Sequence, residues 1–328
     1  MKIVFCGTPA FAVPTLHALL GAGHEIALVV SQPDRPAGRH GQLTAPPVKL
    51  AALGAGLPVL QPEKIRNNAE FRAQLEAIAP EAIVVVAYGR LIPPWMLELP
   101  RLGCINLHAS LLPRYRGAAP IQWAVAMGDA FTGNTTMLLE EGLDTGPILL
   151  QQTHAIEPQQ TAVVLFDQLA EAGAPLVVKT LAGLASGTIK PKPQSHEGVT
   201  FAPLLHREDG RMEFAAYSAT ELKNRWRGFQ PWPGAFTSLD GKKLIVHRLE
   251  TVEAPGSHAS NSAEPGPAGK ALPGQIYVEN HRLFVACAEN TWLELLEVQL
   301  EGKKRLAAAE FLRGMPLATG TRLGTAAQ

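Results

Sequence analysis

GCINLHASLLPRYRGAAP, residues 103–120, is the stretch around which the rest of the chain is organised. Its first part has the pattern of the end of a short strand, in which Asn106 and His108 stand two residues apart. Side chains at that spacing leave a sheet on the same face. Apolar Ile105 and Leu107 alternate with them, which predicts that the opposite face packs on the core. An amide and an imidazole should therefore face one cleft.

A second motif, EEGLDTG at residues 140–146, supplies a carboxylate that a Gly-flanked loop could bring back to the imidazole. Asn106, His108 and Asp144 then form a plausible set for acyl transfer: an amide donor for an oxyanion, an imidazole for proton movement, and a carboxylate that orients it. The set lacks a nucleophile, since Ser110 is the only nearby candidate and no G-x-S-x-G elbow surrounds it. From the residues alone, simpler interpretations stay open. An Asn-x-His pair at a strand end is more often a satisfied polar pair, and Asp144 is most simply a turn residue that caps its own backbone.

The composition indicates two domains and no extended charged surface. The chain has 328 residues with 46% apolar content, which is more than one compact core usually holds. Its 29 basic and 29 acidic side chains cancel, which argues against bulk nucleic-acid binding and leaves only local basic patches. Cys6, Cys104 and Cys287 are far apart in the sequence and form no C-x-x-C pair, so we expect neither a disulfide framework nor a metal site. This cysteine usage fits a protein of the reducing cytoplasm. No apolar run approaches the length of a bilayer span, which predicts no membrane partner.

The first part of the chain predicts an α/β domain with a mostly parallel sheet. An apolar strand at residues 3–6, a helix at 10–20 and a second strand at 26–31 form a β-α-β opening. The turn after the first strand, G-T-P-A-F-A, lacks the later glycines of a dinucleotide motif. AIVVVA at residues 82–87 has the apolar pattern of a central parallel strand, and ligands of such sheets bind beyond the carboxyl ends of the strands.

The second part of the chain has a different pattern. Residues 189–203, IKPKPQSHEGVTFAP, contain three prolines and no periodicity, which predicts a linker. Short β-like segments separated by turns follow, and they predict a small β-barrel. We therefore expect a catalytic domain at residues 1–189, a linker at 190–203 and a second domain at 204–328.

Taken together, the motifs resemble those of the 10-formyltetrahydrofolate-dependent formyltransferases. The signature of that family is an Asn-x-His pair followed by S-L-L-P and, after an interval, by a G-x-D-T-G loop. These strings stand here at residues 106–108, 110–113 and 142–146. The resemblance implies a Rossmann-like, mostly parallel sheet domain that holds no dinucleotide, followed by a small OB-like β-barrel domain.

The same resemblance implies roles for individual residues. Asn106, His108 and Asp144 would be catalytic, and no metal would be needed. The formyl donor, 10-formyltetrahydrofolate, would lie beyond the strand at residues 82–87, and tetrahydrofolate would be the product. The residues that would line its pocket are Val86, Ala87, Tyr88, Gly89, Leu91, Ser110, Leu111, Leu112, Pro113, Gly142 and Asp144.

Residues 32–49, QPDRPAGRHGQLTAPPVK, form a Pro- and Gly-rich segment that is too long for an ordinary connection. On composition alone it is a surface loop. Its beginning resembles the loop with which the tRNA-acting members of the family grip the acceptor end, which draws attention to Arg35 and Arg39. Those members usually continue with Gly and two lysines, whereas residues 40–42 are HGQ here, so fewer phosphate contacts are expected. In the second domain, the expected tRNA contacts are Arg207, Lys303 and Lys304.

The activity that the resemblance implies is transfer of a formyl group from 10-formyltetrahydrofolate to the α-amino group of methionine on initiator tRNA, for the initiation of protein synthesis. We expect a monomer that acts in the cytoplasm. One alternative is a related formyltransferase that acts on another amine, such as an amino-sugar nucleotide or glycinamide ribonucleotide. A 10-formyltetrahydrofolate hydrolase and a catalytically idle RNA-binding protein are two others. The inserted loop and the second domain favour tRNA over a small amine, and the intact Asn, His and Asp argue against an idle protein.

Overall fold

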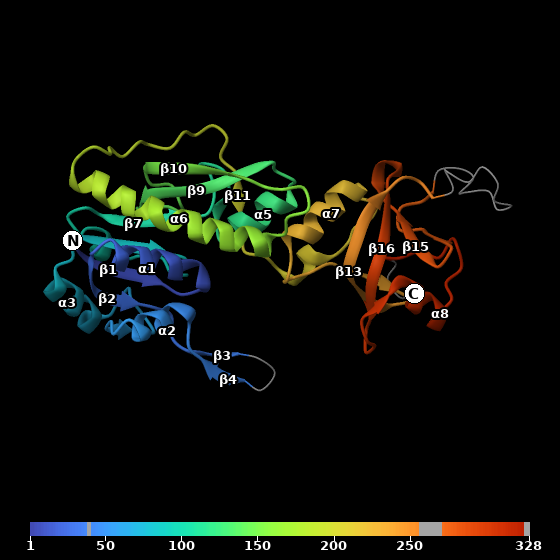
Figure 1. The fold of residues 1–328 in the computed structure, drawn as a ribbon, viewed down its shortest axis with the longest axis horizontal. Coiled ribbons are helices and arrows are strands. Elements are labelled where there is room, and N and C mark those ends of the chain that lie inside the picture. The colour runs from blue at the N-terminus through green and yellow to red at the C-terminus, as the bar shows by residue number, and fades with distance from the viewer. Residues whose placement is uncertain (38–40, 256–270, 325–328) are drawn as a thin grey trace. The chain divides into compact units, whose positions relative to one another are not determined.

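The computed structural model describes residues 1–37, 41–255 and 271–324. They form two compact units, which Figure 1 shows as ribbons. The first unit consists of residues 1–121, 130–158 and 164–204, and the second of residues 122–129, 159–163 and the chain from residue 205 onward. Each unit has a sheet and a hydrophobic core of its own. None of the described helices is both long enough and apolar enough to cross a membrane.

The first unit is built on a seven-stranded sheet with the order β10-β9-β7-β6-β1-β2-β5. The strands from β7 to β5 pair in parallel, whereas β9 pairs antiparallel with both of its neighbours, β7 and β10. Their bounds are β1 Lys2–Gly7, β2 Glu25–Val30, β5 Val59–Leu60, β6 Ala82–Val86, β7 Cys104–His108, β9 Phe131–Leu138 and β10 Ile148–Ala155. Every residue of β6 is buried, because a parallel strand covered on both faces has no solvent side. The parallel pairing of the five strands from β7 to β5 confirms the predicted mostly parallel sheet.

Helices cover both faces of this sheet. On one face, Phe71 of α3 (Ala69–Ile78) and Met96 of α4 (Pro94–Leu97) join the core formed by β1, β6 and β7. On the other, α6 (Ala162–Ala185) approaches β7 so closely that a Cβ at Gly173 would lie 2.7 Å from Cδ2 of Leu107. The other helices of the unit are η1 Ala10–Ala12, α1 Val13–Gly21 and α2 Pro47–Gly54.

The segment after β2 is more ordered than its composition suggested. β3 (Arg35–Ala37) and β4 (Gln42–Thr44) pair antiparallel as a hairpin, and α2 begins shortly afterwards. Pairing joins Arg35 to Thr44 and Ala37 to Gln42. The inserted segment is thus a two-stranded projection followed by a helix rather than a plain loop.

Two further short strands lie outside the main sheet. β8 (Arg116–Gly117) and β11 (Phe201–Ala202) pair in parallel, with Phe201 opposite Arg116 and Ala202 opposite Gly117. β11 comes from the segment whose composition predicted a linker. Residues 190–203 therefore make regular backbone contacts with the loop that follows β7.

The second unit contains an antiparallel sheet with the order β12-β13-β16-β15-β14, to which β17 adds beside β16. Leu222 of α7 and Phe311 of α8 pack into its core. No pairing between described strands joins β12 to β14, as in the partly open barrels of the OB type. The bounds are β12 Phe236–Leu239, β13 Lys242–Val252, β14 Ile276–Glu279, β15 Arg282–Ala286, β16 Trp292–Leu300, β17 Leu306–Ala307, α5 Pro120–Ala126, α7 Ala219–Gly228, α8 Ala308–Gly314, η2 Arg207–Gly210 and η3 Ala288–Asn290.

Candidate active site

All five residues of β7 are buried, so the two faces of the strand differ in chemistry and little in exposure. Ile105 and Leu107 are buried at 0% and 3% exposure, and Asn106 and His108 on the other face are 9% and 6% exposed. Within the described part of the chain, no group hydrogen-bonds the side chain of Asn106. An uncommitted amide in a nearly buried position is available to bind a ligand.

His108 is fixed by a main-chain acceptor. Its Nε2 lies 2.9 Å from the carbonyl oxygen of Tyr115. Because a carbonyl can only accept, Nε2 carries a hydrogen and donates it. Nδ1 is then the ring nitrogen that can gain or lose a proton, and it faces Oδ2 of Asp144 at 3.7 Å. This separation is longer than a direct hydrogen bond, so the carboxylate acts on the ring through its charge.

Asp144 reaches this position from a tight loop. Its Oδ2 accepts a hydrogen bond of 2.8 Å from the backbone N–H of Gly117. The carboxylate of Asp144 thus contacts a different loop and does not simply cap its own turn. Glycines make the turn possible: a Cβ at Gly146 would lie 1.9 Å from the carbonyl oxygen of Leu138, and one at Gly142 would lie 2.0 Å from Oγ1 of Thr145.

The S-L-L-P segment forms a braced turn after His108. The hydroxyl of Ser110 donates to the carbonyl of Arg114 at 2.6 Å, and Oγ1 of Thr135 donates to the carbonyl of Ser110 at 2.6 Å. The same Thr135 oxygen accepts from the backbone N–H of Leu112 at 3.2 Å. Ser110 therefore holds the turn and is not oriented as a nucleophile.

The expected folate segment begins beside this site. Val86 pairs with Leu107, so the residues after β6 follow the carboxyl end of the strand next to Asn106 and His108. Val86 and Tyr88 are buried, whereas Ala87, Gly89 and Leu91 are exposed. The exposed residues form an open, largely apolar edge at the carboxyl ends of the strands, where a flat ligand could lie.

Two titratable groups in the core on this face of the sheet, Tyr88 after β6 and Cys104 at the start of β7, are unsuited to proton transfer. Burial, with a smaller contribution from Cys6, raises the pKa of Tyr88. Burial also raises the pKa of Cys104 to about 12, and its thiol donates to the carbonyl of Met96 at 3.3 Å. Both groups therefore stay neutral near pH 7.

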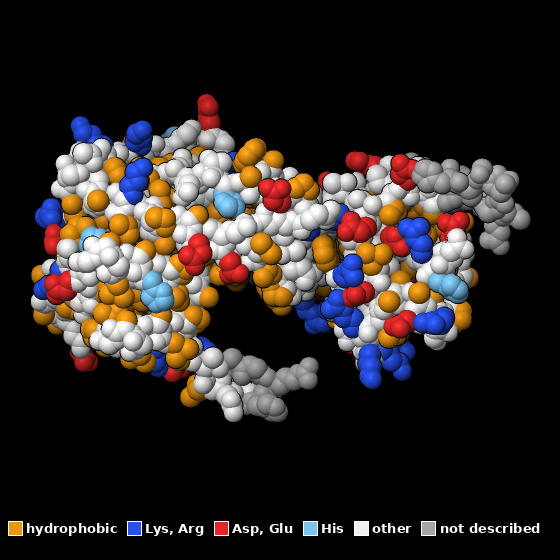
Figure 2. Space-filling view, viewed as in Figure 1, with side chains coloured by type: hydrophobic (Ala, Val, Ile, Leu, Met, Phe, Trp, Pro, Cys, Tyr) orange, Lys and Arg blue, Asp and Glu red, His pale blue; other side chains and the backbone are white. Residues whose placement is uncertain are grey.

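The expected tRNA residues lie in different parts of the chain. Arg35 is exposed on β3 and forms an ion pair of 3.6 Å with Glu63. Arg39 lies outside the described residues. Arg207 begins η2 in the second unit, and Lys303 and Lys304 are exposed in the turn after β16. Figure 2 shows Lys and Arg side chains on the visible face of that unit, interspersed with acidic ones.

Some of these cations are close enough to influence one another. Burial lowers the pKa of Lys243, and the charges of Arg207 and Arg211 lower it further. The Lys243 ammonium lies 3.9 Å from the ring centre of Phe236, and the guanidinium of Arg211 lies 5.4 Å from it. Glu208 and Glu301 act in the opposite direction, and Glu208 pairs with Arg211 at 2.6 Å, so Arg207 belongs to a group of mixed charges.

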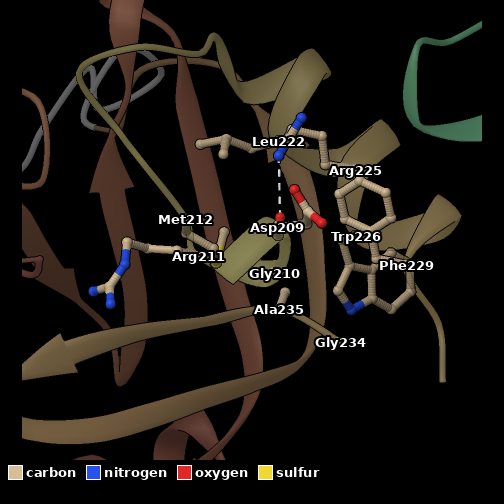
Figure 3. Close-up of a pocket in the computed structure, with 10 residues that line it drawn as sticks. All are labelled: Asp209, Gly210, Arg211, Met212, Leu222, Arg225, Trp226, Phe229, Gly234 and Ala235. Atoms are coloured by element: carbon tan, nitrogen blue, oxygen red, sulfur yellow. Dashed lines mark hydrogen bonds between the residues drawn. The ribbon is translucent and has the colours of Figure 1, made fainter. Parts of the chain in front are cut away.

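A small cavity lies within the second unit, next to α7 (Figure 3). Its volume is about 10 Å³, which is room for about one water molecule. In the close-up, Arg225 donates across it to the carbonyl of Asp209 at 3.0 Å. The cavity is too small for a folate. Elsewhere, the described residues contain no group of three or more His, Cys, Asp or Glu side chains arranged to bind a metal ion.

Several contacts of this site involve residues that the sequence analysis did not single out. Tyr115 supplies the carbonyl that holds His108, and Gly117 supplies the N–H that holds Asp144. Gln194 contacts the Asp144 loop through its side chain. The only sequence signal for the first two was their place in the R-Y-R-G string after S-L-L-P, and nothing in the sequence marked Gln194.

Known proteins similar to this chain agree on one family. The family model described as "Formyl transferase" matches residues 1–181, and that of "Formyl transferase, C-terminal domain" matches residues 204–316. A curated relative, "Methionyl-tRNA formyltransferase" of Acidobacterium capsulatum, is 63% identical over 99% of this chain and 100% of its own length. A relative of the same name from Koribacter versatilis is 54% identical over 99% of each chain.

Solved structures show the same fold at much lower identity. The sugar 3N-formyl transferase WlaRD, crystallised in the presence of dTDP and 5-N-formyl-THF, has a TM-score of 0.63 at 15% identity, with 93% of this chain and 99% of that chain covered. HypX from Aquifex aeolicus, in complex with tetrahydrofolic acid, has a TM-score of 0.60 at 15% identity, with 95% of this chain and 47% of that chain covered. The chain therefore belongs to the formyl transferase family, on its methionyl-tRNA formyltransferase branch.

Proposed function

We propose that the chain transfers the formyl group of 10-formyltetrahydrofolate to the α-amino group of methionine esterified to initiator tRNA, for the initiation of protein synthesis. The observation that supports this most is the approach of Asp144 to His108, which shares one face of β7 with Asn106 and is held by the carbonyl of Tyr115. The name of the relatives that match over the whole chain supports the choice of methionyl-tRNA as the acceptor.

The donor site that we propose is the open edge after β6 together with the braced turn after β7. Its exposed members are Ala87, Gly89 and Leu91, and the Asp144 loop lies on the other side of His108. An apolar edge with few side chains suits a flat ring that is bound largely through the backbone. The donor supplies a formyl carbon that an amine can attack.

In the proposed reaction, the amine nitrogen bonds to the formyl carbon, the bond from that carbon to N10 breaks, and one proton passes from the amine to N10. The Asn106 amide would donate to the formyl oxygen as negative charge develops on it. Nδ1 of His108, with Asp144 beside it, would hold the proton in transit. No side-chain nucleophile is required, which agrees with the commitment of the Ser110 hydroxyl to the carbonyl of Arg114.

For the tRNA, we propose contacts by Arg35 and Arg39 of the inserted segment and by Arg207, Lys303 and Lys304 of the second unit. We further propose that the chain acts as a monomer in the cytoplasm. The three cysteines support a reducing compartment, because all are free and buried.

The decisive experiment follows the formyl group. The chain is incubated with labelled 10-formyltetrahydrofolate and one acceptor at a time: methionyl initiator tRNA, methionyl elongator tRNA, uncharged initiator tRNA or an amino-sugar nucleotide. We expect label in the methionyl initiator tRNA, with much less in the elongator and none in the uncharged tRNA. Faster transfer to the amino-sugar nucleotide would support the related small-amine enzyme instead. Release of formate without an acceptor would support the hydrolase.

A further inference from the structure

The segment at residues 190–203 lies directly on the loops of the candidate site. Lys192 pairs with Ile148, with N···O distances of 2.9 and 2.8 Å, which brings the chain to the start of β10. Thr200 accepts from the backbone N–H of Tyr115 through Oγ1 at 2.8 Å. Between these two points the chain passes the loop that contains Asp144, and Gln194 is the residue that contacts it.

The side chain of Gln194 uses both its donors and its acceptor there. Its Nε2 donates to the carbonyl of Asp144 at 2.7 Å and to that of Gly146 at 2.8 Å. Its Oε1 accepts from Nε and Nη2 of Arg116 at 3.1 and 2.7 Å. A glutamine held by a charged guanidinium on one side and two carbonyls on the other has little freedom to move.

The loop turns sharply where Gln194 binds it. Asp144 has φ 51°, in the left-handed region that aspartate adopts more readily than most residues with a Cβ. The two carbonyls that Gln194 binds stand on either side of Thr145, so the amide spans the turn. Arg116 precedes Gly117, whose N–H holds the Asp144 carboxylate. The main chain of Asp144 is thus connected to β8 through Gln194 and Arg116, and its side chain is connected to β8 through Gly117.

We infer that Gln194 is a positioning residue for the formyl transfer: it holds residues 144–146 so that the Asp144 carboxylate faces Nδ1 of His108. The inference rests on the proposed function, because it concerns the same site. Gln194 acts through Asp144 and does not itself reach the reacting atoms. The segment that joins the two domains in sequence is, on this view, part of the catalytic apparatus.

The test compares Gln194→Ala with Gln194→Glu in the full chain. Glutamate has the same length and can accept from Arg116, but it has no donor for the two carbonyls. We expect kcat for methionyl-tRNA to fall about 10- to 100-fold in both variants, because a shift of about 1 Å in a catalytic group has effects of this size. The KM for each substrate should change less than about threefold. If kcat falls equally in the two variants, the essential part of the Gln194 side chain is its Nε2 donor group and not its Oε1 acceptor.

A double-mutant comparison separates positioning from a general structural role. If Gln194 acts only through Asp144, then Gln194→Ala should lower single-turnover formylation less than about twofold in an Asp144→Ala background. A residue that merely stabilised the domain would lower the rate by the same factor in both backgrounds. The matched control for Gln194→Ala is Gln275→Ala, because Gln275 also binds a loop main chain, accepting from the N–H of Leu272 at 3.1 Å in the second unit. Its kcat should match that of the wild type.

Three results would overturn the inference. The first is wild-type turnover in both Gln194 variants while the wild-type chain formylates methionyl-tRNA, which would leave the proposed function intact. The second is a loss of single-turnover rate by Gln194→Ala that is as large in the Asp144→Ala background as in the wild-type background. The third is unfolding of both variants at the assay temperature, seen by thermal melting, which would assign Gln194 a structural role. No product from the wild-type chain would instead overturn the proposed function, and the inference with it.

Discussion

His108 is the residue on which the proposed chemistry depends most directly. The contact of Nε2 with the carbonyl of Tyr115 leaves a single ring nitrogen for proton exchange, and that nitrogen faces Asp144. A histidine without such a partner can present either nitrogen. In the proposed reaction, selection of one tautomer would present Nδ1 to the proton in transit.

Replacement of His108 by alanine should lower turnover about a hundredfold or more, because it removes both the proton carrier and the group that Asp144 faces. Tetrahydrofolate binding should change much less. Single-turnover formylation and folate titration measure the two effects. The control is His154→Ala in β10, since its Nε2 also contacts an oxygen, Oε1 of Gln168 at 3.0 Å, but lies away from the site. Near wild-type turnover in His108→Ala would show that the centre is assigned wrongly.

The residues that could be predicted from the sequence are those whose motifs are local. Asn106 and His108 share one strand, and Asp144 stands in a Gly-flanked loop of recognisable composition. The contact from Tyr115 to Thr200 spans 85 residues, and that from Arg116 to Gln194 spans 78. A lone polar residue in an aperiodic segment gives no sign of such a distant partner, so these contacts could not be predicted.

At the scale of elements, the β3–β4 hairpin shows how a segment without periodicity can still be ordered. Asp34, just before the hairpin, accepts from Nζ of Lys49 in α2 at 2.9 and 2.8 Å and from Nε2 of Gln61 at 2.7 Å. The base of the hairpin is thus tied to a helix and to the residue after β5. Its strands have three residues each and contain no alternation, so their pairing could not be predicted from sequence.

Replacement of Asp34 by asparagine should therefore destabilise the chain in a pH-dependent way. The hydrogen bond from Lys49, and to a smaller extent that from Gln61, holds the pKa of Asp34 below its ordinary value. A group whose pKa is lower in the folded state stabilises that state above the unfolded pKa, and the stabilisation disappears as the pH falls through the folded pKa. The Tm difference between Asp34→Asn and wild type should thus be largest at neutral pH and shrink in acid.

Thermal melts over a pH series measure that difference. The control is Glu76→Gln, which removes an exposed carboxylate with one ion-pair partner, Arg72, and should change the Tm little at any pH. A Tm difference for Asp34→Asn that stays constant from neutral to acidic pH would contradict the role given to the carboxylate charge.

At the scale of the whole molecule, the domain division at residues 189 and 204 stays a prediction, and residues 190–203 are now seen to belong to the first unit, where β11 pairs with β8. The charge balance is a second whole-molecule property. Because 29 basic and 29 acidic side chains cancel, tRNA binding must rest on local groups of cations. Arg305 pairs with Glu297, which it shares with Arg248, whereas Lys303 and Lys304 beside it have no acidic partner among the described residues.

The last prediction concerns those two lysines. Removing both, as Lys303→Ala with Lys304→Ala, should raise the KM for methionyl-tRNA and leave kcat at saturating tRNA nearly unchanged, because the lysines would bind phosphate and not the reacting groups. Each lost phosphate contact should also reduce the slope of log affinity against log salt by about 0.7 to 0.9. Steady-state kinetics and tRNA binding over a salt series measure both. Arg72→Ala, which removes an exposed but ion-paired cation of the first unit, is the control and should leave the slope as it is. If the double variant kept the wild-type slope, the turn after β16 would have no part in the tRNA surface, and Arg207 and the inserted hairpin would have to supply the contacts.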